Sequence, residues 1–206
     1  MANLKEKYVT EFVPALQQQL GIKNKMLVPR LEKIVLNMGF GIVEKDVQKQ
    51  IVEDLAKITG QRPVLCKARK SIANFKLRQG MVIGAKVTLR RDRMYEFFER
   101  LTQSTLARIR DFHGVPNRGF DGRGNYTLGL KEHSIFPEMI DTGVTGELDV
   151  GLDITFVTTA TDDKGARALL TVMGIVVVSG VLICVVSTWI VVGRLVRYDR
   201  DQLYAY

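Results

Sequence analysis

A long stretch of the chain carries positive charge and no negative charge. The 37 residues from 55 to 91 contain no Asp or Glu, whereas ten of them are Lys or Arg. The usual salt-bridge partners are therefore missing from this stretch. Cationic side chains in such a setting are typical of surfaces that contact phosphate groups. We interpret the stretch as part of a nucleic-acid-binding surface; the alternative is an ordinary solvated face.

Composition agrees with this interpretation and limits the fold. The chain has 206 residues, with 30 Lys plus Arg against 22 Asp plus Glu, which gives a formal net charge of +8. Such a surplus favours polyanionic partners such as nucleic acid or an anionic membrane. A hydrophobic fraction of 46% is enough to fill a core, so intrinsic disorder is excluded for most of the chain.

Residues suited to catalysis or metal binding do not form a pattern. His113 and His133 lie twenty positions apart, and neither has a Cys or carboxylate at metal-ligand spacing. The glycine-rich segment 119–124 lacks the Lys-Ser/Thr pair of a phosphate-binding Walker loop. Cys66 and Cys184 give no disulfide framework, which favours a reducing cytoplasm. We therefore expect no enzyme, no metal and no cofactor.

The elements that must position the cationic side chains follow from periodicity. Alternation of apolar and polar residues predicts half-buried strands at 33–38, 85–91 and 152–157, and a further strand is expected near 63–68. In the strand at 85–91, Val87 and Leu89 face inward, while the outward positions are held by Lys86, Thr88 and Arg90. One face of this strand is therefore cationic.

Helical spacing of apolar residues predicts the remaining elements. We expect helices over 4–20, 47–58 and 94–112, with Pro14 dividing the first, and a helix that begins at Thr161 as its N-cap. Residues 113–127, which include four glycines, are expected to form a loop.

These elements predict an α+β fold, in which an antiparallel sheet has helices packed on one face and a basic RNA-binding face on the other. The chain carries no zinc-finger or basic-zipper pattern for reading duplex DNA. RNA, which is recognised through shape, phosphates and 2′-hydroxyls, fits a polar sheet face better.

Seven ordered blocks resemble a known family. They lie at 29–39, 60–63, 67–80, 84–90, 120–126 (Phe-Asp-Gly-Arg-Gly-Asn-Tyr), 135–138 and 152–155. Over residues 1–175 the chain is similar to the bacterial form of large-subunit ribosomal protein five. The resemblance implies a structural, non-enzymatic component of the large ribosomal subunit, in the cytoplasm, with residues 1–174 as its 5S ribosomal RNA-binding domain. It also implies contact with P-site transfer RNA and a bridge to the small subunit.

The resemblance further implies site residues and partners. The residues expected at 5S ribosomal RNA are Asn37, Gln61, Arg62, Lys67, Thr88 and Arg90. Those expected at transfer RNA are Arg69, Lys70, Asn74, Phe75, Lys76, Arg78 and Gln79, where Phe75 either stacks on RNA or anchors its loop. The bridge to a small-subunit protein is expected in loops 113–127 and 137–147, with Arg118, Arg123 and Glu138. Large-subunit ribosomal RNA and neighbouring ribosomal proteins complete the expected partners.

The C-terminal segment, 175–206, does not resemble the family's usual ending. Residues 168–193 carry no charge, and 175–192 are long enough for a marginal transmembrane helix. Three interpretations are open: a membrane anchor, an added buried strand or helix, or a segment of other origin, through a fusion or a shifted reading frame. We favour the last. The corresponding rival functions are a membrane-tethered basic protein, with a membrane partner only if this tail inserts, and an RNA chaperone outside the ribosome.

Overall fold

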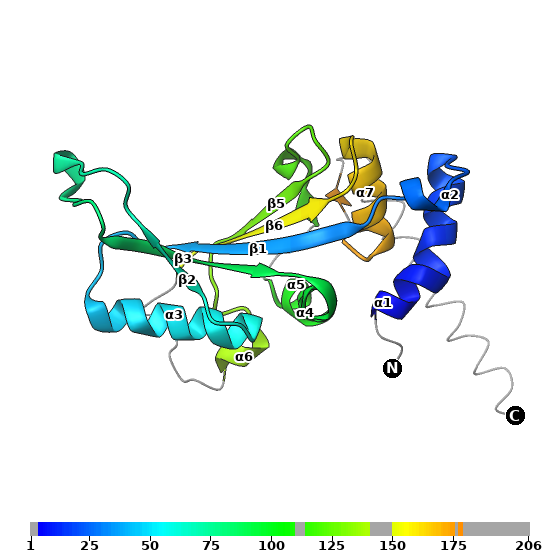
Figure 1. The fold of residues 1–206 in the computed structure, drawn as a ribbon. Coiled ribbons are helices and arrows are strands. Elements are labelled where there is room, and N and C mark those ends of the chain that lie inside the picture. The colour runs from blue at the N-terminus through cyan, green and yellow to red at the C-terminus, as the bar shows by residue number, and fades with distance from the viewer. Residues whose placement is uncertain (1–3, 110–113, 141–149, 176, 179–206) are drawn as a thin grey trace, which may run out of the picture.

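A twisted antiparallel sheet forms the centre of the molecule. The computed structural model describes residues 4–109, 114–140, 150–175 and 177–178. Within them, five strands pair in the order β2-β3-β1-β6-β5 (Figure 1). Their bounds are β1 Leu31–Gly39, β2 Val64–Lys67, β3 Val82–Leu89, β5 Tyr126–Leu130 and β6 Leu152–Thr158. All four strand pairings in this sheet are antiparallel, as the alternating polarity of the strands predicted.

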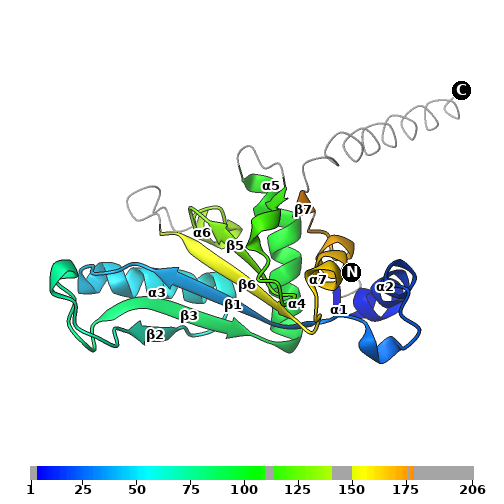
Figure 2. The same ribbon diagram turned by 90° about the horizontal axis from the view of Figure 1, so that it is seen from above.

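Helices cover one face of this sheet and one of its ends. Below the sheet in Figure 1 lie α3 (Lys45–Thr59), α4 (Arg91–Arg100), α5 (Leu106–Arg108) and α6 (Pro137–Ile140). At one end lie α1 (Leu4–Lys7), α2 (Val13–Leu20) and α7 (Asp163–Val172), which Figure 2 shows from above. The opposite face of the long strands carries no helix (Figure 1). The predicted α+β fold with helices on one face is confirmed.

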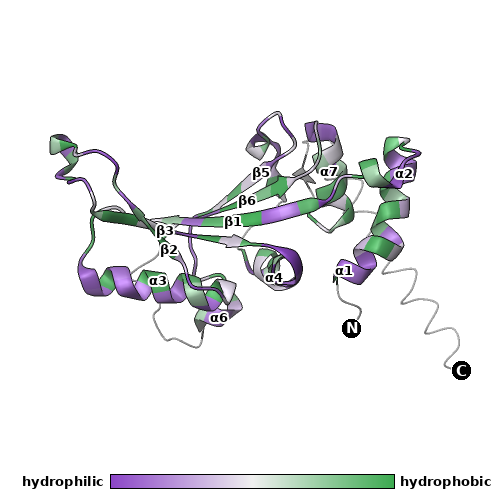
Figure 3. Ribbon diagram, in the orientation of Figure 1, coloured by the Kyte–Doolittle hydropathy of each residue, from purple (hydrophilic) through white to green (hydrophobic). Residues whose placement is uncertain are grey.

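The core lies between the sheet and the helices beneath it. Ile34, Leu36 and Met38 point from β1 into this layer and are fully buried. From below, Phe98 of α4 packs edge-on against Phe156 of β6, with ring centroids 5.7 Å apart. Hydrophilic residues run along the outside of α3 (Figure 3). Each long strand therefore has one face in the core, and its other face is available for binding.

Two predicted helices contain irregular turns. The first is divided into α1, a π-helical turn at Tyr8–Phe12, and α2, whose first turn holds Pro14. This division agrees with the prediction, because Pro14 lacks the amide that a continuous helix would use. The helix expected from 94 to 112 begins earlier, at Arg91, and passes through a π-helical turn at Leu101–Thr105 before α5. Residues 110–113 lie outside the described ranges.

The loop prediction for 113–127 is wrong at both ends. Strand β5 already begins at Tyr126, and the short strand β4 (Val115–Pro116) pairs in parallel with β7 (Val177–Val178). The glycines of the segment hid an alternation in which Tyr126 is buried and Thr127 is exposed. The N-cap of α7 is Asp162 rather than Thr161, and the helix begins at Asp163.

Among the described residues, no helix is long and apolar enough to cross a membrane. Of the apolar C-terminal segment, Ile175 is fully buried and Val177–Val178 form β7, while residues 176 and 179–206 lie outside the description. The interpretations of that segment as an anchor, an added element or a foreign ending fall mainly on those residues.

Candidate nucleic-acid interface

The side of the sheet without helices is here called the outer face. Its residues form rows that run across the strands, each row consisting of paired residues of neighbouring strands. Asn37 of β1 pairs with Lys86 of β3 on one side and with Asp153 of β6 on the other. Two residues along, Val35 lies between Thr88 and Thr155 in the same way. The row at Val35 continues to Thr127 of β5, whose hydroxyl lies 3.2 Å from that of Thr155. The predicted outward orientation of Asn37, Lys86 and Thr88 is confirmed.

Arg90 extends this face beyond the end of β3. Its backbone is extended, with φ −140° and ψ 160°, because it serves as N-cap of α4. Its guanidinium lies 4.0 Å from the carboxylate of Glu32, and both side chains are more than half exposed. An exposed pair at this distance contributes little to stability, so the guanidinium is accessible to a phosphate.

Gln61 joins the same region from the end of α3. Gly60 ends that helix with a left-handed backbone, φ 65°, which turns the chain toward β2. The Gln61 side-chain amide then donates to the carbonyl of Thr88 over 3.4 Å. The structure thus brings Gln61 beside Thr88, and the next residue, Arg62, is exposed. Lys67, at the other end of β2, is also exposed and lies at the base of the following loop.

This loop, residues 68–81 (here the arm), rises from the sheet on the side away from α3 and α4 (Figure 1). Its base is closed by the amide of Ala68, which donates to the carbonyl of Met81 over 2.8 Å. Nearer the tip, Ile72 and Leu77 exchange backbone hydrogen bonds of 2.9 and 3.1 Å. The arm is therefore a hairpin-like projection tied together by its backbone.

The arm holds every residue that was expected at transfer RNA. Its cations are exposed, and none of them is in a salt bridge within the described part of the chain: Arg69, Lys70, Lys76 and Arg78. Asn74 and Gln79 are exposed as well. The Phe75 residue is 71% exposed, so its ring does not anchor the loop. Of the two roles considered for Phe75, stacking on RNA is the one that this geometry favours.

The residues expected at the intersubunit bridge do not come together. Arg118 lies in the 3-10 turn Asn117–Gly119 and Arg123 in the following loop, and both are exposed. Glu138, in contrast, is on α6 beneath the sheet, where it forms an ion pair with Arg100. Residues 141–149 of the second expected bridge loop lie outside the description.

Sequence reasoning assigned no role to three polar residues of the outer face. Asp153 and Thr155 of β6 and Thr127 of β5 lie there beside the predicted residues. The alternation of 152–157 already placed the first two outward, which was the available signal. Thr127 was missed because β5 itself was not predicted.

His133 has a structural role. Its Nε2 lies 3.9 Å from the carboxylate of Asp54, and its Nδ1 lies 3.2 Å from the amide nitrogen of Val150. Both His133 and Asp54 are buried, and the contact links α3 to the segment before α6. The described residues contain no group of three potential metal ligands.

Comparison with known proteins adds a family assignment to this geometry. A family described as "Ribosomal protein L5" matches residues 24–78, and the family of the C-terminal part of the same ribosomal protein matches 82–177. Proteins named "Large ribosomal subunit protein uL5" from Streptococcus pneumoniae strains Hungary19A-6 and CGSP14 are each 55% identical over 177 residues. That alignment covers 84% of this chain and 97% of each relative.

The chain belongs to the ribosomal protein L5 family. This membership confirms the resemblance and places the chain in the large ribosomal subunit of a bacterial cytoplasm. The L5 family is a structural class of translation proteins rather than an enzyme class. Of the expected contact residues, only Gln79 lies between the two matched regions, and residues after 177 lie beyond both.

Proposed function

We propose that this chain is the component of the large subunit that binds 5S ribosomal RNA, with the outer face of its sheet as the contact surface. The observation that carries the proposal is the arrangement of polar side chains on that face. Thr88 lies between the exposed cations Lys86 and Arg90, and Asn37 lies beside Lys86 in the adjacent strand. The two cations suit phosphates, and the hydroxyl and amide suit 2′-hydroxyls and base edges.

The edge of this face adds three further contacts. Gln61 is held beside Thr88 by its hydrogen bond, and Arg62 and Lys67 are exposed at the two ends of the β2 segment. Their positions agree with a single surface for 5S RNA that spans β1, β2 and β3. Neighbouring large-subunit RNA and proteins are proposed to surround the remaining surface.

The arm is proposed to contact P-site transfer RNA. Its exposed cations can bind phosphates without reading sequence, and Phe75 can stack on a base or sugar. Of the three residues expected at the intersubunit bridge, Glu138 is engaged by Arg100, which leaves the exposed Arg118 and Arg123.

The double variant Thr88→Ala/Arg90→Ala tests the 5S proposal. We expect weaker binding of 5S RNA at every salt concentration and a shallower salt dependence, by roughly 0.7–0.9 in the log–log slope for the one phosphate contact that Arg90 supplies. Filter binding over a salt series measures both quantities.

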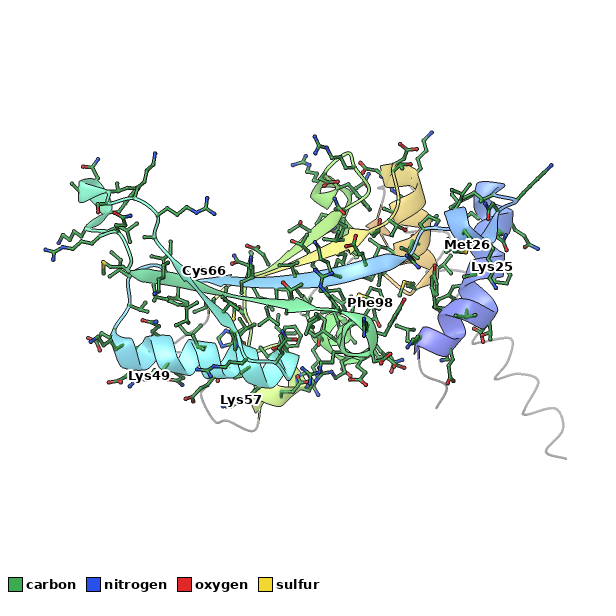
Figure 4. The ribbon with its side chains drawn as sticks, in the orientation of Figure 1. Lys25, Met26, Lys49, Lys57, Cys66 and Phe98 are labelled. Atoms are coloured by element: carbon green, nitrogen blue, oxygen red, sulfur yellow. The ribbon has the colours of Figure 1, made fainter. Side chains whose placement is uncertain are left out.

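Lys49→Ala is the matched control, because Lys49 lies on α3, on the far side of the sheet (Figure 4). An unchanged affinity of the double variant would move the site off the outer face. Equal affinity of the wild-type chain for 5S RNA and for unrelated RNA would favour the chaperone function instead.

A further inference from the structure

A second cationic projection stands at the edge of the sheet opposite the arm. It is the 117–125 loop, which leads into β5, whereas the arm joins β2 to β3. Because β2 and β5 are the two edge strands, the arm and this loop flank the sheet from opposite sides. Figure 1 shows both rising on the side away from α3 and α4. The outer face therefore lies between two raised cationic segments.

We propose that the 117–125 loop is the second wall of the RNA-binding surface and holds a ribosomal RNA backbone through Arg118 and Arg123. This inference rests on the proposed function of the outer face. It gives these two arginines an RNA partner in place of a small-subunit protein.

The charge arrangement of the loop supports a phosphate ligand. Arg118 and Arg123 are exposed, and neither takes part in a salt bridge within the described residues. A third arginine, Arg167 of α7, is used internally: it donates to the side-chain oxygen of Asn117 and lies 5.4 Å from the ring centroid of Phe120. One arginine thus braces the loop while two others are left for a ligand.

Two carboxylates, those of Asp121 and Asp163, accept hydrogen bonds from the loop's own donors. Asp121 accepts the amides of Arg123 and Asn125 over 2.8 and 3.0 Å, and the side-chain amide of Asn125 over 2.7 Å. These hydrogen bonds lower the pKa of Asp121, and the one from the Asn125 side chain has the largest effect. Asp163 accepts the amide of Gly124 over 3.0 Å. Both acids therefore act as braces, and their charges are partly offset by these donors.

Backbone geometry fixes the loop in this shape. Gly124 has φ +81°, and a Cβ there would lie 2.5 Å from the carbonyl oxygen of Ala160. Its own carbonyl accepts the hydroxyl of Thr158 over 2.6 Å. At the other end, a Cβ on Gly119 would lie 2.4 Å from the carbonyl oxygen of Thr127. A loop ordered before binding loses little conformational entropy when it engages a ligand.

Continuity with the outer face favours RNA over a protein partner. Thr127 lies two residues after the loop, and its hydroxyl contacts that of Thr155 in the row that ends at Thr88. The row therefore runs from the end of the 117–125 loop to the proposed 5S site, and three of its four residues (Thr127, Thr155 and Thr88, with Val35 between the last two) carry a hydroxyl. A nucleic-acid strand lying on the outer face would reach the loop without leaving the surface.

The double variant Arg118→Ala/Arg123→Ala tests the inference in the full-length chain. With 5S RNA and large-subunit RNA as separate probes, we expect the affinity for at least one to fall about tenfold. The log–log salt slope should become shallower by roughly 1.4–1.8, as for two lost phosphate contacts. Lys45→Ala/Lys49→Ala removes the same charge from α3 and is expected to bind like wild type. Circular dichroism and thermal melts verify that both variants fold.

A second variant separates charge from positioning. Gly124→Ala keeps both arginines but forces the loop away from Ala160, so its RNA affinity should fall as well. Wild-type affinity of the Arg118→Ala/Arg123→Ala protein for both RNAs would overturn the inference. If subunits carrying that protein also joined small subunits poorly, the arginines would belong to the bridge. The proposed 5S function is judged independently by Thr88→Ala/Arg90→Ala, so either proposal can fail alone.

Discussion

At the scale of single residues, Asp153 is the unexpected member of the outer face. Its carboxylate lies on β6 directly beside Asn37, in a row that also contains Lys86. Phosphates bound along this row would be repelled by it. Asp153 therefore gives a direct test of whether RNA crosses the middle of the sheet.

We expect Asp153→Asn to tighten RNA binding about threefold at low salt, which corresponds to one like-charge pair about 7 Å apart in water, worth roughly 0.6 kcal/mol. The gain should shrink at high salt because the repulsion is screened. Filter binding at two salt concentrations measures this, with Asp46→Asn on α3 as control. A loss of affinity would mean instead that Asp153 accepts a hydrogen bond from the RNA.

Two tyrosine hydroxyls link stability to alkaline pH. Tyr126 donates to the carbonyl of Pro116 and Tyr8 to that of Pro29, each over 2.8 Å. Burial raises the pKa of both residues to about 12, above the usual value near 10. Because the folded-state pKa is the higher one, the stability that these groups contribute is complete below pH 10 and is lost as the pH rises through 12.

We therefore expect the free energy of unfolding to fall between about pH 9 and about pH 12, and to fall less steeply in Tyr126→Phe, which has no hydroxyl to ionise. Urea unfolding across this range measures the slopes. Identical slopes for the variant and the wild type would show that Tyr126 does not contribute to the alkaline loss.

At the scale of elements, the arm and the outer face are separate modules. The arm closes on itself through Ala68 and Met81, so changes at its tip leave the sheet intact. We expect Lys76→Ala/Arg78→Ala to leave 5S binding unchanged and to weaken binding of P-site transfer RNA to large subunits that carry the variant. Filter binding of transfer RNA to such subunits measures the loss. Reduced 5S affinity in this variant would mean that the two surfaces are not independent.

The strands that could be predicted from the sequence are those in which polar and apolar residues alternate clearly. Strands β1, β3 and β6 were predicted because polar and apolar residues alternate along them. Strand β5 was missed because Gly129 occupies one of its outward positions and four glycines come shortly before it. Glycine is typical of turns, whereas Gly129 lies inside a strand with an ordinary backbone conformation.

The outer face could be predicted from its strands, and the arm from the acid-free cationic stretch together with the resemblance. The outward positions of Asn37 and Thr88 followed from alternation, and their expected role from the family resemblance. The bracing of the 117–125 loop by Asp163, and the contact of Asp54 with His133, join positions 39 and 79 residues apart. No local period relates such positions, so only the folded structure reveals them.

At the scale of the whole molecule, the folded unit extends slightly past residue 174. Ile175 is fully buried, and β7 pairs with β4 two residues later. We propose that the domain includes Ile175 and β7 and therefore extends at least to Val178. This moves the boundary expected from the sequence by at least four residues.

Two truncations test this boundary. A chain that ends at Val178 should keep the melting temperature and the RNA affinity of the full chain. A chain that ends at Gly174 should melt several degrees lower, since burying an isoleucine is worth roughly 1.5–3 kcal/mol. Thermal unfolding of the three proteins measures this. An equal decrease of the melting temperature in both truncations would place residues after 178 in the core.

The central position of β1 also sets the order of events during synthesis. This strand pairs with β3 on one side and β6 on the other, and Leu152, the partner of Met38, is made 114 positions later. A nascent chain therefore carries β1 with one edge unpaired until most of the protein has been translated. Such an edge can join other chains. An interruption of elongation before residue 152 would thus leave a chain prone to aggregate, whereas one after residue 158 would leave a chain that already holds all five strands of the sheet.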